Sequence, residues 1–407
     1  DTDRSRGLGD VYKRQANSYI GIFIIMFSII SSGMVSVMTQ NIGAGRPGVA
    51  YQARQLGLLF NAVAGVLMAA FLFSGAGAIL RMVGIADALY EPALIYLKIV
   101  GGGCILNAVI PIFSSYLRAF GYTKQPLYAT IVGNIANFVM NAVFLFVLHK
   151  GVAGVATATV ISKILNLCIV LYFSHKLISA KNSTERIANK TVLGQIVKVG
   201  LPSACETALY NVAMMLVIRF LNQMDAEGLN VTARSYTATI SNFSYCVGAA
   251  LAQANAIMTG WHIGAGELEE CDRGTKRAAF VGVCVAVCME TAIVLGSGFI
   301  MPLFTDNPEM TALVRKLLAI DIVLEIGRVT NLVFGQALKT SGDAVFPAVI
   351  AAVFMFVFAV GGTWLFGISM GLMAVGAYIG LASDECVRAV GMVWRWKTGK
   401  WRTKKLV

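Results

Sequence analysis

The chain is poor in charge. Of its 407 residues, 13% are Asp, Glu, Lys or Arg, whereas 57% are hydrophobic. Soluble domains carry about 25% charged residues and about 45–50% apolar ones, so this composition excludes an ordinary water-soluble protein.

Residues that catalysis and metal binding commonly use are also scarce. The chain has three His residues, and neither HExxH nor GxSxG occurs. This argues against a membrane-embedded hydrolase. The eight Cys residues are scattered, without metal-ligand spacing or a disulfide framework. We therefore expect no enzymatic activity, no metal site and no bound cofactor.

Long apolar runs are what the sequence does have. A helix that crosses a hydrocarbon layer of about 30 Å needs about 20 residues, and eleven such runs occur. They are apolar all round rather than alternating, which indicates helices and not barrel strands. The predicted spans are 16–39, 54–80, 92–117, 126–147, 153–174, 195–221, 235–258, 277–302, 313–337, 345–366 and 371–394. The predicted fold class is an all-α, polytopic membrane protein.

Basic residues outnumber acidic ones, with 33 Lys and Arg against 21 Asp and Glu, and they are unequally distributed between the two sides of the membrane. Alternate loops together with the C-terminal tail carry nineteen basic residues on one side, and the loops of the other side carry five. This asymmetry follows the positive-inside rule and places the basic tail 395–407 in the cytoplasm. We expect a multi-pass protein of the cell (inner) membrane whose tail contacts anionic lipid, with no nucleic-acid partner.

Residues 1–15 do not fit this topology. They contain seven charged residues in fifteen, and they lack the apolar segment and cleavage site of a signal peptide. We interpret them as a non-native leader and exclude them from the fold prediction.

An internal repeat organises the rest of the chain. Three landmarks recur at an offset of 220 or 221 residues: Ile42–Gly45 as Ile263–Gly266, Leu117–Gly121 as Leu338–Gly342, and Gly151 as Gly371. The offset pairs loops of the same side, which predicts parallel repeats related by an axis along the membrane normal.

The repeat predicts two six-helix bundles. The C-terminal bundle, 195–394, has six spans, whereas the N-terminal bundle, 16–174, has five. The counterpart of span 195–221 would precede residue 1, so we expect the first helix to be missing. Residues 175–194 form the predicted cytoplasmic linker.

Acids inside the spans are the main functional candidates. A charge there costs from about 2.5 to more than about 10 kcal/mol, so each is a functional hypothesis. The in-span acids are Glu206, Glu290, Asp321, Glu325, Asp384 and Glu385. No partner for Glu290 is visible in the sequence, and we assign it no role.

Span 313–337 carries the densest set. Asp321, Glu325 and Arg328 recur at i, i+4 and i+7, which places them on one helical face, with Asn331 one turn further on. Two acids against one base leave a surplus carboxylate that can bind and release a proton or a cation. A purely structural ion-pair network is the alternative.

Glu206 lies four residues after Pro202, which loosens the local helical hydrogen bonding. Tyr210 shares its face at i+4, and Asn211 is adjacent. No base lies within one turn of Glu206, so the acid is a second ion-coupling candidate.

Two further polar groupings have either a functional or a structural role. Asn134, Asn137 and Asn141 share one face of span 126–147, where they either line a substrate cavity or form interhelical hydrogen bonds. Asp384 and Arg388 are spaced i, i+4, which favours a structural pair.

Several motifs together resemble one known family. They are the duplicated IGAG and LRAxG-type loops, GLPSACE at the start of the second half, EIGRVTN followed by ALKTSGD, and the ending DECVRAV to RWKTGKW. This combination, over 16–407, resembles the multidrug and toxic compound extrusion (MATE) family. The resemblance implies two six-helix bundles around a V-shaped central cavity and antiport coupled to H⁺ or Na⁺. It also implies that Glu206, Asp321 and Glu325 are ion-coupling acids.

The leading functional prediction is an antiporter that exports amphipathic, often cationic, small molecules by alternating access. The predicted ion-coupling residues are Glu206, Asp321, Glu325 and Arg328, and the predicted substrate cavity contains Asn134, Asn137, Asn141, Tyr210, Asn211 and Asn331. We expect a monomer. The alternative is a flippase for lipid-linked oligosaccharides, which the six in-span acids against five in-span bases disfavour.

Overall fold

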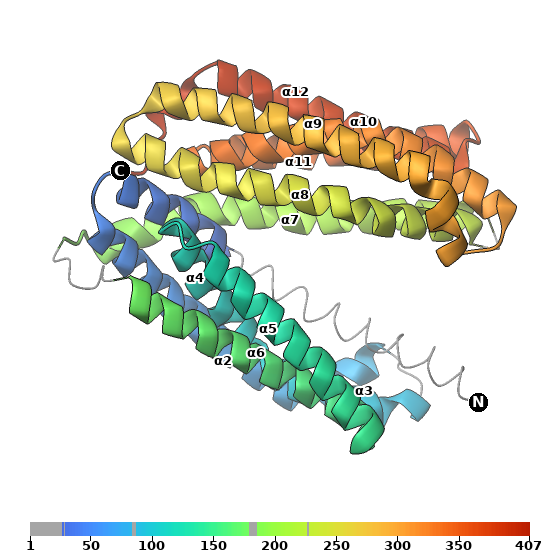
Figure 1. The fold of residues 1–407 in the computed structure, drawn as a ribbon, viewed down its shortest axis with the longest axis horizontal. Coiled ribbons are helices and arrows are strands. Elements are labelled where there is room, and N and C mark those ends of the chain that lie inside the picture. Colours follow the sequence, from blue (N-terminus) through green and yellow to red (C-terminus); the bar gives the residue numbers. More distant parts are fainter. Residues whose placement is uncertain (1–26, 28, 84–86, 179–184, 226–227) are drawn as a thin grey trace. The chain divides into compact units, whose positions relative to one another are not determined.

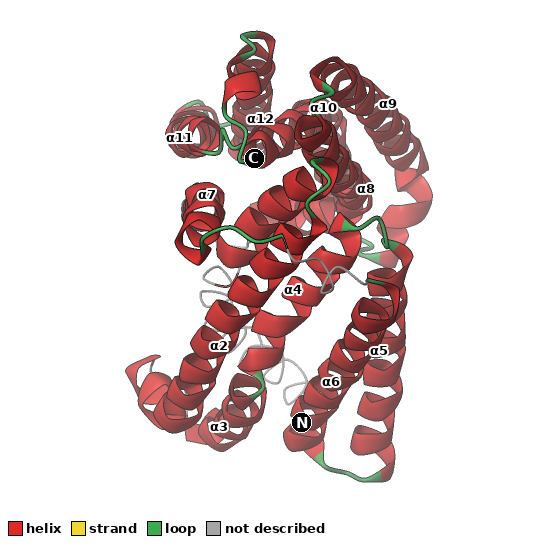
Figure 2. Ribbon diagram, turned by 90° about the vertical axis from the view of Figure 1, so that its left-hand side faces the viewer, coloured by secondary structure: helices red, strands yellow, loops and turns green. Residues whose placement is uncertain are grey.

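The computed structural model describes residues 27, 29–83, 87–178, 185–225 and 228–407. All regular structure in this part of the chain is helical (Figures 1 and 2). This confirms the predicted all-α fold class. The polypeptide forms two compact units, 1–42 with 46–200 and 43–45 with 201–407.

The first unit contains residues 29–42 of a helix that ends at residue 43, and the first part of α7. Its other helices are α2 (Pro47–Val83), α3 (Asp87–Gly102), α4 (Cys104–Ala119), α5 (Lys124–Ala142), continued by a π-helical turn (Val143–Val147), and α6 (Gly151–Leu177). Within this unit α4 packs on α2 and α6, and α5 packs on α6.

The second unit contains most of α7 (Asn189–Met224) and all later helices. These are α8 (Leu229–Ala265), α9 (Leu268–Ile300), α10 (Pro308–Ser341), α11 (Val345–Phe354), two π-helical segments (Met355–Val360 and Thr363–Ser369) and α12 (Met373–Lys397). Figure 1 shows α8, α9, α10 and α12 running side by side, and α10 packs on the other three.

Each predicted span coincides with helix, although the first lies partly outside the described residues. By length and composition, seven helical segments of the described chain can cross a membrane, fewer than the eleven predicted. Helices α8, α10 and α12 are not among the seven, because they carry the polar and charged residues of the second unit. Predicted span 92–117 comprises α3 and α4, which are separated at Gly103.

The connection between α6 and α7 is shorter than the predicted linker 175–194. Helix α6 continues to Leu177 and α7 begins at Asn189, because both helices extend beyond their apolar runs into polar sequence. On the α7 side, the side chain of Gln52 fixes this connection by donating a hydrogen bond to the carbonyl of Ile187 at 2.7 Å.

The repeat landmarks share one backbone conformation. Gly45 and its counterpart Gly266 have φ values of +74° and +80°, and Gly121 and Gly342 have +85° and +98°. Because L side chains avoid this left-handed region, glycine ends the preceding helix at low cost. The repeated motifs are therefore tight helix-terminating turns.

A glycine brings α10 and α12 into close contact beside the polar residues. A Cβ atom at Gly327 would lie 2.7 Å from the backbone nitrogen of Cys386 and 2.8 Å from the carbonyl carbon of Glu385. Only glycine permits this approach without a shift of one helix. The approach places the acids of α12 next to the charged face of α10.

Candidate functional site

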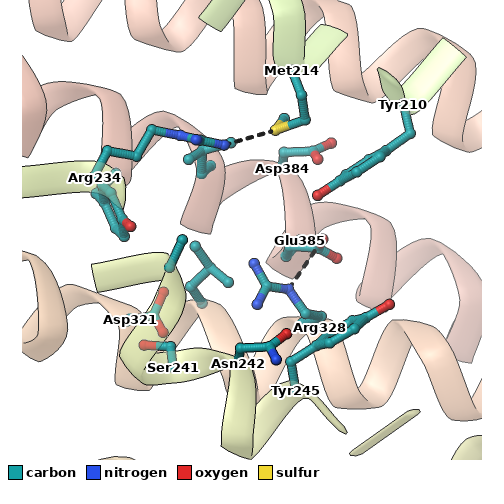
Figure 3. Close-up of a pocket in the computed structure, with 14 residues that line it drawn as sticks. Tyr210, Met214, Arg234, Ser241, Asn242, Tyr245, Asp321, Arg328, Asp384 and Glu385 are labelled. Carbon is teal, nitrogen blue, oxygen red and sulfur yellow. Dashed lines mark hydrogen bonds and ion pairs between the residues drawn. The ribbon is translucent and has the colours of Figure 1, made fainter. Parts of the chain in front are cut away.

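A cavity of about 270 Å³ lies inside the second unit, enclosed by α7, α8, α10 and α12 (Figure 3). Its lining is Tyr210, Met214, Arg234, Ala238, Ser241, Asn242, Tyr245, Asp321, Leu324, Arg328, Tyr378, Leu381, Asp384 and Glu385. It therefore combines aromatic walls with several charged groups.

A second pocket of about 210 Å³ shares part of this lining. Tyr210, Tyr245, Arg328 and Glu385 border both spaces. The second pocket adds Glu206, Thr207, Asn331, Leu332, Met355 and Arg388. Four of the predicted site residues thus lie around one pocket: Glu206, Tyr210, Arg328 and Asn331.

The three charged residues of α10 lie together, as their spacing predicts. Asp321 and Glu325 are buried, with exposed fractions of 3% and 0%. Arg328 pairs with the Glu325 carboxylate on its own helix, and Asp321 lies beside Ser241 of α8 (Figure 3). Arg328 also stacks over the ring of Tyr245, with its guanidinium 5.7 Å from the ring centroid.

Helix α12 adds two acids and a second base. Arg388 binds both oxygens of Asp384 at 3.0 and 2.6 Å, which confirms the predicted i, i+4 pair. Glu385 joins the helices, because it lies 2.8 Å from Arg388 and 3.7 Å from Arg328 (Figure 3). Asn331 donates a hydrogen bond to the same carboxylate at 3.0 Å.

Glu290 of α9 belongs to this group, although no partner for it is visible in the sequence. It is fully buried, and neither carboxylate oxygen has a hydrogen-bond partner among the described residues. Its electrostatic neighbours include Asp321, Glu325, Arg328 and the Ser244 hydroxyl. The available sequence signal was the acid itself, standing alone in an apolar run.

We call Glu290, Asp321, Glu325, Asp384, Glu385, Arg328 and Arg388 the buried charge cluster. It contains five carboxylates and two guanidinium groups, so full ionisation would leave three uncompensated negative charges. Buried like charges repel one another and lose hydration. Neutralising part of this surplus would reduce the repulsion within the cluster.

Glu206 has a basic partner that the sequence did not indicate. Lys339 of α10 approaches its carboxylate to 2.7 Å, and both side chains are largely buried. The pair is invisible to local spacing because the residues are 133 positions apart on different helices. Glu206 is therefore compensated, unlike Glu290.

The structure separates the other two predicted residues of α7. Tyr210 borders both pockets and points into the cavity (Figure 3). Asn211 is exposed and lines neither pocket. Successive helical residues are about 100° apart, so Asn211 cannot share the Tyr210 face.

The asparagines of α5 lie in the first unit, where two of them border a pocket and one forms an interhelical hydrogen bond. Asn134 and Asn137 line a pocket of about 190 Å³ with Lys163 of α6. Asn137 donates a hydrogen bond to the Ser162 hydroxyl of α6 at 3.3 Å, and Asn141 donates to Asn137 at 3.0 Å. Asn141 does not line the pocket.

No metal-binding arrangement of three or more His, Cys, Asp or Glu residues is found within the described ranges. The carboxylates of the buried charge cluster therefore do not by themselves form a preformed ligand shell. Uptake of a cation there would need polar groups from the surrounding helices or water, whereas uptake of a proton needs one oxygen.

Comparison with known proteins gives consistent matches. A family model described as MatE matches residues 15–143 and 202–365. The chain is 31% identical over 395 residues to "Uncharacterized transporter YisQ" of Bacillus subtilis (strain 168), covering 96% of this chain and 86% of the relative. It is 20% identical over 325 residues to "Probable multidrug resistance protein NorM" of Thermotoga maritima, covering 77% and 68%.

A solved structure has the same fold. An outward-facing multidrug resistance MATE family transporter of the MOP superfamily superimposes with a TM-score of 0.87 at 19% identity. The match covers 97% of this chain and 89% of the other.

Proposed function

Because the chain belongs to the MatE family of multi-pass membrane transporters, we propose that it is an antiporter that exports amphipathic, often cationic, small molecules in exchange for H⁺ or Na⁺. The observation that carries the proposal is the buried charge cluster beside the cavity of the second unit. The protein acts in the cell membrane with its C-terminal tail in the cytoplasm.

The lining of the cavity suits a cationic amphiphile. Tyr210, Tyr245 and Tyr378 offer aromatic faces, and Met214 offers a polarisable thioether. Aromatic faces attract organic cations, and methionine adapts to varied apolar shapes. Asp321 and Glu385 border the same space and supply negative charge.

Coupling follows from competition for these carboxylates. An ionised cluster attracts a cationic substrate, and a proton or Na⁺ that neutralises Asp321 removes that attraction. Binding of the ion and of the substrate then favours different states of an alternating-access cycle. Arg328 pairs with Glu325, and Arg388 pairs with Asp384. Glu385 shares these two arginines, so the three surplus negative charges fall on Glu385, Asp321 and Glu290.

Transport of anionic lipid-linked sugars is the less favoured function. A diphosphate group needs available cations, but Arg328 and Arg388 are already engaged by carboxylates, which leaves Arg234 as the remaining arginine of the cavity lining. Arg-dependent binding of a lipid-diphosphate sugar would favour this alternative.

Equilibrium binding tests the proposal. We expect a fluorescent lipophilic cation to bind the purified protein several-fold more weakly when the pH is lowered by about two units, because protonation neutralises the cluster. Fluorescence anisotropy measures the affinity at each pH, with Na⁺ titrated in parallel at constant ionic strength. An affinity that responds to neither ion would contradict the coupling mechanism.

A further inference from the structure

A separate cavity of about 780 Å³ lies in the first unit, between α2, α4 and α6. Its lining is Tyr51, Arg54, Phe113, Cys168, Leu171, Tyr172, Ser174, His175, Lys176 and Ile178. The lining contains two cations and no acid. It lies near the first turns of α2 and the last turns of α6, whose flanking loops are predicted to be cytoplasmic.

Arg54 of α2 lines this cavity, and its guanidinium group is surrounded by three aromatic rings. Its guanidinium carbon lies 4.4 Å from the ring centroid of Tyr51, 4.9 Å from that of Tyr116 and 5.5 Å from that of Phe113. No acidic side chain of the described chain pairs with Arg54, and its buried Nε has no acceptor. The aromatic faces stabilise the cation, but its fork of N–H donors is left without an anion.

Further donors lie around the same space. Ser174 is 3% exposed, and its buried hydroxyl has no hydrogen-bond partner among the described residues. A helical serine often donates a hydrogen bond to the carbonyl one turn earlier, and buried hydroxyl groups are normally hydrogen-bonded. The Ser174 hydroxyl is therefore available to a ligand. The Lys176 ammonium group lies beside the Tyr172 hydroxyl at 3.1 Å and adds positive charge.

The second repeat provides an internal comparison. At the offset of 221 residues, His175 corresponds to Trp396 and Tyr51 to Asp272, and these counterparts share a 2.7 Å hydrogen bond. Trp401 stacks on Trp396, with ring centroids 4.1 Å apart and 9° between the planes. Both indoles are buried, so the tail fills this region of the second unit.

The first repeat carries different side chains at the corresponding positions of its sequence. The acid at 272 is replaced by the neutral Tyr51, and Arg54 stands where the second repeat has Thr275. The first repeat thus has a cation and no acid at these two positions.

We propose that this cavity is a binding site for a phosphate ester, with the headgroup of an anionic membrane phospholipid as its ligand. Guanidinium, ammonium and hydroxyl donors match the oxygens of a phosphate group. The volume greatly exceeds that of a phosphate ion, and Phe113 and Leu171 form an apolar wall for the adjoining part of the ligand. The site belongs to the first unit and shares no lining residue with the cavity of the second unit, so it is independent of the proposed function.

Native mass spectrometry of the purified, detergent-solubilised protein tests the site with three probes: phosphatidylglycerol, phosphate-free diacylglycerol and sn-glycerol 3-phosphate. We expect retention of phosphatidylglycerol but not of diacylglycerol, and a decrease of about tenfold or more in its affinity for Arg54→Gln. Ser174→Ala removes a single neutral donor and should weaken binding about threefold. The matched control is Arg277→Gln, which removes an exposed arginine of α9.

The probes also distinguish the two sources of phosphate. Arg54-dependent binding of phosphatidylglycerol supports the lipid source. Arg54-dependent binding of sn-glycerol 3-phosphate alone supports the phosphate site but assigns it a soluble ligand. Equal retention of every probe by the wild type, Arg54→Gln and Ser174→Ala would overturn the proposal.

Discussion

Replacing Asp321 with Asn is expected to lower ion-coupled efflux by about tenfold or more, in the range of typical coupling energies between two binding sites. The side chain keeps its size but can no longer ionise. It is buried beside Ser241 at the wall of the cavity, and no base of the described residues forms a salt bridge with it. Efflux of a fluorescent cation from cells measures the effect, with immunoblots of membranes for protein quantity.

The matched control is Asp306→Asn, which makes the same chemical change at an exposed position before α10. This variant should transport like the wild type. Equal efflux by both variants and the wild type, at equal protein levels, would remove Asp321 from the coupling mechanism.

Replacing Arg328 with Met is expected to destabilise the second unit by about 3–5 kcal/mol, the usual cost of leaving a buried charge unpaired. Glu325 would lose its salt-bridge partner, and Glu385 would keep only Arg388 and Asn331. The protein is heated to a series of temperatures, and size-exclusion chromatography measures the fraction that stays folded at each one.

A second substitution identifies the cause of this instability. Arg328→Met combined with Glu325→Gln removes both charges of the pair and should recover most of the lost stability. If the double variant is as unstable as Arg328→Met, the arginine stabilises the fold by its packing and not by its charge. The electrostatic account of the cluster would then be wrong.

Local sequence spacing predicted the parts of the site that lie on single helices. The i, i+4 and i+7 pattern of Asp321, Glu325 and Arg328 and the i, i+4 pair of Asp384 and Arg388 depend only on the helical period. The helical fold and the family were equally accessible, because long apolar runs and the repeated loop motifs are local patterns. Within the site, the contacts that the sequence predicted correctly are thus those that the geometry of one helix determines.

Contacts between helices could not be predicted in the same way. Glu206 with Lys339, and Asn331 with Glu385, join residues far apart in the sequence. Their meeting depends on how closely the helices pack, which a glycine at 327 determines for α10 and α12. Glu290 was missed for the same reason, since its neighbours come from α8 and α10.

Coupled transport by the purified protein in liposomes tests the central claim most directly. A pH gradient and a Na⁺ gradient are imposed separately, and uptake of a fluorescent lipophilic cation is recorded for the wild type and for Asp321→Asn. We predict accumulation driven by at least one gradient, abolished by an ionophore that dissipates that gradient and strongly reduced in Asp321→Asn. Uptake under neither gradient would contradict the antiporter account.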